Sequence, residues 1–94
     1  MQGLRLWQIR QEVNGWLWIV APTMSGRKAM PLKETRAWFK ELKQIEKCIK
    51  GQENLRGWLA YTRIENTHIV HALRKLGAKP YDIDEEKIWF KKKI

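Results

Sequence analysis

The residues best suited to acid–base chemistry lie close together, between positions 65 and 71 of this 94-residue chain. Histidine titrates near neutral pH and a carboxylate can accept a proton, so His68 and Glu65 are the candidate catalytic residues, with His71 as a further base. The alternative is that both histidines are surface residues of a helix. Cys48, inside a predicted helix, is interpreted as a small core or boundary residue rather than a nucleophile.

A second chemical signal is the segment Ser25, Gly26, Arg27 and Lys28, which lies in a predicted loop between a strand and a helix. Backbone N–H groups near a glycine, reinforced by two cations, can bind a phosphate or pyrophosphate group. The alternative is a solvated basic loop without a ligand. The segment is therefore a candidate cofactor-binding site. It is not part of a more extended motif that would distinguish a phosphate site from a solvated loop.

The third signal is on the longest predicted helix, residues 32–50, where Trp38, Leu42, Ile45 and Ile49 form the predicted buried stripe and another face is basic. Basic side chains recur there every three or four residues, which places them on one face. They are Lys33, Arg36, Lys40, Lys43, Lys47 and Lys50. Such a face is either a solvated surface or a contact for nucleic-acid phosphates or an acidic partner, and in the second case binding would weaken steeply with salt.

A strand followed directly by a helix, residues 57–77, is the element around which the other segments are arranged. Aromatic and β-branched residues after Gly57 favour a strand. Asn66 is a good N-cap because its side-chain oxygen can accept a hydrogen bond from the first helical turn. Apolar residues then recur at helical spacing, and Gly77 can adopt the left-handed conformation that ends a helix.

The remaining segments complete a small sheet. Residues 4–10 alternate weakly, and Asn14-Gly15 predicts a type I′ hairpin turn before 16–20, whose apolar run is typical of a strand buried on both faces. Short extended segments follow at 81–83 and 87–90. The order β-β-α-β-α-β(β) predicts a single α/β (α+β) domain, residues 1–94, with a mostly antiparallel sheet packed by two helices.

Composition limits the function classes. A net charge of +9 implies an acidic partner, such as nucleic acid, a phosphate-bearing cofactor or an acidic protein surface. The six tryptophans either fill the core or form an exposed adhesive face. The single cysteine excludes an internal disulfide. No apolar run reaches the roughly 20 residues of a membrane span, and the N-terminus lacks the apolar core of a signal peptide, so no membrane partner is expected.

The strand, Asn66, the apolar helix and Lys75-Leu76-Gly77-Ala78 resemble the C-terminal half of a GNAT-superfamily N-acetyltransferase. The similarity is closer to small GNAT-like proteins of tailed bacteriophages, of the internal virion or morphogenesis type, which also have a Trp-rich strand before the first helix. It covers residues 14–94 and is strongest over 57–78. The resemblance implies a GNAT-like fold that lacks the family's first strand and first two helices. It also implies that acetyl-CoA would bind through the 25–28 loop and Asn66.

Two departures from the family pattern bear on activity. Leu73 stands four residues before Gly77, where the enzymes often have a tyrosine that protonates the leaving thiolate. In the 25–28 loop the next small residue after Gly26 is Ala29, one position too late for the pyrophosphate pattern. These departures favour a scaffold without catalysis and without a cofactor.

Three functions follow as hypotheses. The first is a non-catalytic phage protein that binds a protein partner or itself, as a virion or assembly component or as an inhibitor of a host protein. The second is an acetyl-CoA-dependent N-acyltransferase, with an open cleft between the strands that carry Trp18 and Trp58. The third is a nucleic-acid-binding protein that uses the basic helix face and Lys91 to Lys93. The expected location is the host cytoplasm or the virion.

Overall fold

The computed structural model of the chain describes residues 4–21 and 32–94. These residues form, in order, β1 (Gln8–Val13), β2 (Trp16–Val20), α2 (Leu32–Lys50), β3 (Gly57–Arg63), α3 (Thr67–Lys75), β4 (Lys79–Asp84) and β5 (Lys87–Lys93). The order of strands and helices and the mostly antiparallel sheet confirm the predicted α+β fold class.

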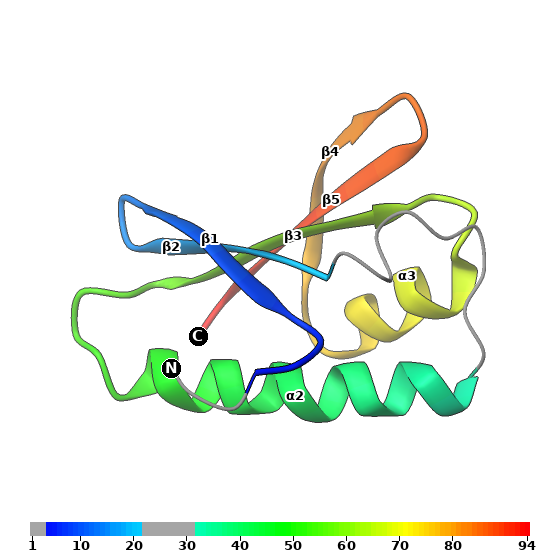
Figure 1. The fold of residues 1–94 in the computed structure, drawn as a ribbon. Coiled ribbons are helices and arrows are strands. Elements are labelled where there is room, and N and C mark those ends of the chain that lie inside the picture. The colour runs from blue at the N-terminus through cyan, green and yellow to red at the C-terminus, as the bar shows by residue number, and fades with distance from the viewer. Residues whose placement is uncertain (1–3, 22–31) are drawn as a thin grey trace.

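The strands form one sheet in the order β1-β2-β3-β5-β4 (Figure 1). Strands β2 and β3 are parallel, while the other neighbouring pairs are antiparallel. The parallel pair arises because α2 returns the chain along the sheet between the two strands. Their pairing extends only from Trp16 with Gly57 to Trp18 with Leu59, and both strands continue beyond it.

Both helices lie on the same side of the sheet, and the core lies between them and the strands (Figure 1). Alternate residues of each interior strand point toward the helices. The strands contribute Leu17, Ile19, Trp58, Ala60, Ile88 and Phe90 to the core, and α2 contributes Trp38, Leu42, Ile45 and Ile49, the stripe that its periodicity predicts. The opposite face of the sheet has no helix on it among the described residues.

The ends of α3 partly match their prediction. Gly77 has a φ of +96°, its N–H donates to the carbonyl of Arg74, and the N–H of Ala78 donates to that of Leu73, which is a Schellman ending. The helix also begins directly after Asn66, whose carbonyl accepts from the next turn. However, the Asn66 side chain makes no capping hydrogen bond, so that part of the prediction is wrong. Its backbone, with φ −82° and ψ 69°, departs from the extended conformation typical of an N-cap, and the side chain is buried inside the fold.

The N-terminal hairpin also departs from its prediction. Asn14 and Gly15 both have positive φ, as a type I′ turn requires, and confirm the turn. The first strand, however, begins at Gln8 rather than at residue 4. The backbone N–H groups of residues 5–7 donate to the side chain of Glu41 on α2 instead of to a strand.

Candidate binding surface

The uncovered face of the sheet carries aromatic side chains on adjacent strands. They alternate with the core residues and therefore point away from the helices. The residues are Trp16 and Trp18 on β2, Tyr61 on β3, and Trp89 on β5, all half-buried. The six tryptophans thus divide equally, since Trp7, Trp38 and Trp58 are buried in the core. The strand at 16–20 is accordingly buried fully on one face only, which corrects its prediction.

The rings on this face contact one another across the strands. The centroid of Trp89 lies 4.8 Å from that of Tyr61, 6.1 Å from Trp18 and 6.4 Å from Tyr81 on β4. These distances lie within the range of tilted aromatic pairs. Trp18, Tyr61, Tyr81 and Trp89, here called the aromatic cluster, therefore form a continuous apolar surface across four strands, and Tyr81 at its edge is 49% exposed.

Lysine ammonium groups lie over two of these rings. Lys87 Nζ is 4.8 Å from the centroid of Tyr61, and Lys91 Nζ is 4.4 Å from that of Trp16. Both distances are within cation–π range. Trp16 lies across Gly57, where an added Cβ would overlap the carbonyl oxygen of Lys92 and come 2.8 Å from Trp16 Cζ3. The glycine therefore leaves the space that the Trp16 ring and the β5 backbone occupy beside it.

A hollow of about 490 Å³ lies beside Trp16 at this end of the sheet. Its lining consists of Trp16, Gly77, Lys79, Tyr81, Lys91 and Lys93. Every charged residue in this described lining is a lysine. We call it the lysine–aromatic hollow. Two aromatic rings and three ammonium groups favour a ligand that is both flat and anionic.

The predicted basic face of α2 lies elsewhere. All six of its basic residues are exposed. At 3.6 residues per turn they fall on the side of α2 opposite its buried stripe, so they point away from the sheet. The structure therefore does not bring the helix lysines onto the open face that carries the aromatic cluster.

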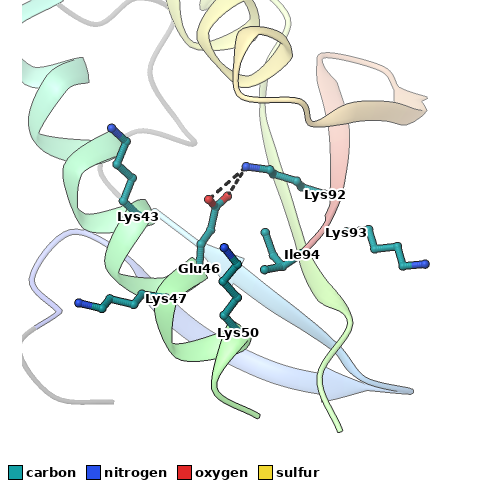
Figure 2. A pocket seen from close by; sticks show the side chains of 7 residues that line it. All are labelled: Lys43, Glu46, Lys47, Lys50, Lys92, Lys93 and Ile94. Carbon is teal, nitrogen blue, oxygen red and sulfur yellow. Dashed lines mark hydrogen bonds and ion pairs between the residues drawn. The ribbon is translucent and has the colours of Figure 1, made fainter. Parts of the chain in front are cut away.

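One flank of that helix meets the end of β5 in a groove of about 390 Å³ (Figure 2). The carboxylate of Glu46 accepts from Trp58 Nε1 at 2.8 Å and pairs with Lys92 Nζ at 3.0 Å. In Figure 2 the side chains of Lys43, Lys47 and Lys93 extend away from this pair in different directions. The groove is cationic, but its lysines do not converge on one point, so it is a weaker candidate for a binding site.

The predicted catalytic residues do not form an acid–base pair. Glu65 Oε1 accepts from Arg63 Nη2 at 2.9 Å, and Glu86 pairs with the same guanidinium at 3.0 Å. The hydrogen bond to Glu65 raises the pKa of Arg63, opposed in part by desolvation. His68 and His71 are exposed on α3, and no hydrogen bond joins either of them to Glu65 within the described part of the chain. Residues 25–28, the predicted phosphate loop, lie outside the described residues.

Asn66, the predicted cofactor contact, lies in an unusual environment. It is 1% exposed, and neither Oδ1 nor Nδ2 has a hydrogen-bond partner among the residues described. The buried hydroxyl of Thr62 is likewise unpaired within this part of the chain. Both residues follow the point where β3 stops pairing with β2. Buried polar atoms without partners are costly, so the parting of the two strands is a second place where a polar ligand could bind.

Glu41 is a structural residue that the sequence pattern did not reveal. Its Oε1 accepts from the backbone N–H groups of Arg5, Leu6 and Trp7 at 2.9–3.0 Å, and the side chain is nearly buried. Trp7 Nε1 in turn donates to the carbonyl of Trp38 at 2.9 Å. Glu41 lies beside Leu42 in a helix rich in charge, so its spacing alone does not distinguish it from a solvated glutamate.

No family model matches this chain, and no curated protein or solved structure was found that matches it. Within residues 4–21 and 32–94, no group of three or more His, Cys, Asp or Glu side chains is arranged to hold a metal ion. No helix in the described ranges combines the length and the apolar character needed to cross a membrane.

Proposed function

We propose that this protein is a non-catalytic binding protein that holds a negatively charged partner on the open face of its sheet. The observation that carries the proposal is the aromatic cluster, which lies uncovered among the described residues and has lysines over and beside its rings. Half-buried aromatic rings supply large contact area at a low cost in side-chain entropy, as binding surfaces do. The net charge of +9 supports an acidic partner.

The arrangement of the candidate catalytic groups supports a binding role over an enzymatic one. A general base must reach the proton that it removes, and a second group must protonate the leaving atom. Glu65 is engaged by Arg63, while His68 is exposed without a partner among the described residues. Leu73 is buried in the core and has no proton to donate.

With the resemblance to GNAT-like proteins of tailed bacteriophages, we propose that the scaffold acts as a virion or assembly component, or as an inhibitor of a host component. The single parallel pair in the described sheet, β2 with β3, supports a GNAT-like arrangement. The open face would then be the surface on which the partner binds.

The six tryptophan indole N–H groups test this proposal in ¹⁵N-labelled protein. Heparin, poly-L-glutamate and oligo(dT) are titrated separately at low salt. We expect at least one polyanion to shift the signals of Trp16, Trp18 and Trp89, which lie on the open face, while those of Trp7, Trp38 and Trp58 stay unchanged. Shifts confined to backbone amides of α2 would move the binding surface to the basic helix face and overturn the proposal, as would no response to any polyanion.

A second function, acetyl-CoA-dependent N-acyl transfer, is favoured by a separate observation. The buried polar side-chain atoms of Asn66 and Thr62 have no partner among the described residues, and both residues follow the point where β3 stops pairing with β2. A pantetheine amide placed there would supply the missing hydrogen bonds. Calorimetric titration with acetyl-CoA and with CoA tests this function. Saturable one-to-one binding that is lost on Asn66→Ala would support it, and no heat at high protein concentration would exclude it.

A further inference from the structure

We propose that the partner is a single-stranded nucleic acid, with one nucleotide seated in the lysine–aromatic hollow and neighbouring bases on the aromatic cluster. The inference rests on the proposed function and names the chemistry of its partner. Proteins that bind single strands combine aromatic platforms for the bases with cations for the backbone. The open face holds both, on adjacent strands.

The hollow fits one nucleotide by composition. Trp16 and Tyr81 provide ring surfaces for a base, and Lys79, Lys91 and Lys93 provide ammonium groups for phosphate. The volume of about 490 Å³ lies within the ~300–1,000 Å³ range of small-molecule sites. Its described lining contains no carboxylate, so an anion that enters makes no direct contact with a side chain of its own sign.

Lysine ammonium groups lie over two of the rings on which a base would stack. Lys91 lies over Trp16 and Lys87 lies over Tyr61. A base that stacks on either ring takes the place of the ammonium group, which remains on a flexible side chain and can turn to a phosphate oxygen. The same lysine would thus stabilise the ring face in the free protein and the nucleic-acid backbone in the complex.

The aromatic cluster extends this site across the sheet. From the edge at Tyr81 the rings continue to Trp89, which contacts both Tyr61 and Trp18. Unstacked bases of a single strand can occupy successive rings, whereas the bases of a duplex are stacked on each other and are not available to them. The geometry therefore favours single strands over duplex.

Charge argues against a second copy of the chain as the occupant. The open face carries Lys79, Lys87, Lys91 and Lys93, against Asp82 and Asp84. Two such faces would bring an excess of like charges together, which is unfavourable. An acidic peptide would satisfy the lysines but leave the rings without flat partners, so we treat it as an outcome of the test.

The test measures the affinity of fluorescein-labelled (dT)₁₂ by anisotropy between 50 and 200 mM salt, with a 12-base-pair duplex and poly-L-glutamate as competitors. We expect (dT)₁₂ to bind more tightly than either competitor. Replacement of Lys79, Lys91 and Lys93 by Gln should reduce the log–log salt slope by about 2. The matched control replaces Lys40, Lys43 and Lys47 on α2, which removes the same charge from outside the lysine–aromatic hollow and should alter the slope less.

The stacking contribution is tested separately with Tyr81→Ser, because this side chain is half exposed and its loss should leave the fold intact. We expect affinity for (dT)₁₂ to fall about 5- to 150-fold. Unchanged affinity, or equal binding of duplex and single strand, would overturn the inference. If poly-L-glutamate shifts the open-face indoles and (dT)₁₂ does not, the inference fails while the proposed function stands. If heparin, poly-L-glutamate and (dT)₁₂ all leave them unshifted, both fail.

Discussion

Glu41→Gln tests whether a buried carboxylate anchors the N-terminal segment. The wild-type Oε1 accepts three backbone N–H groups, from residues 5, 6 and 7. A hydrogen bond to a charged group contributes about 1.5–3 kcal/mol, and a neutral acceptor is roughly half as strong. Water can accept hydrogen bonds from the N–H groups of Arg5 and Leu6, which are not fully buried, and so offset part of the loss. It cannot do so at Trp7, which is buried. We therefore expect about 2 kcal/mol of destabilisation.

Urea unfolding followed by tryptophan fluorescence measures this loss, and an unchanged m-value would show that the unfolding reaction is the same. For a domain of this size, ~2 kcal/mol corresponds to a fall in Tm of about 8–16 °C. Glu53→Gln is the control, since Glu53 is exposed in a turn. The Trp7 indole N–H signal should also move, because its bond to Trp38 depends on the anchored segment. Stability within 0.5 kcal/mol of wild type would refute the reasoning.

Three further predictions concern residues that support or border the open face of the sheet. Gly57→Ala should destabilise the fold by about 3 kcal/mol in urea unfolding, because its Cβ would overlap the Lys92 backbone, and an unchanged midpoint would contradict the close approach. Gly77→Ala should lower the free energy of unfolding by about 1–2 kcal/mol in the same assay, because a φ of +96° is strained for alanine. Space is not the cause, since the nearest side-chain atom is 3.8 Å from the added Cβ, and Gly51→Ala is the control. Burial, then the nearby Asp82 charge, raises the pKa of Tyr81 above 10.0, so its contribution to stability is full below pH 10 and is lost as pH rises through the folded-state pKa. A tyrosinate absorbance titration that is the same for Tyr81→Phe and wild type would contradict this shift.

Interactions between residues close together in the sequence determined most of the helices, strands and turns. The apolar stripe of residues 32–50, the Asn14-Gly15 turn and the Gly77 helix ending depend on periodicity and φ preference within a few residues, and all were predictable. The position of β1 was not predictable from neighbouring residues. Its start depends on Glu41, more than 30 residues away, which draws the N–H groups of residues 5–7 out of strand pairing.

The sequence by itself determined the charge, the number of tryptophans and the alternation that gives each strand two faces. Only the tertiary structure decided which of those faces is buried in the core and which is left without a helix. Both helices pack on one side of the sheet (Figure 1). Trp58 therefore became core, while Trp16, Trp18 and Trp89 remained half-buried on the other side. Insertion of β5 between β3 and β4 then placed Trp89 and its lysines beside Tyr61 and Tyr81. Alternation is a property of neighbouring residues, whereas the covering of one face depends on contacts between segments far apart in the chain.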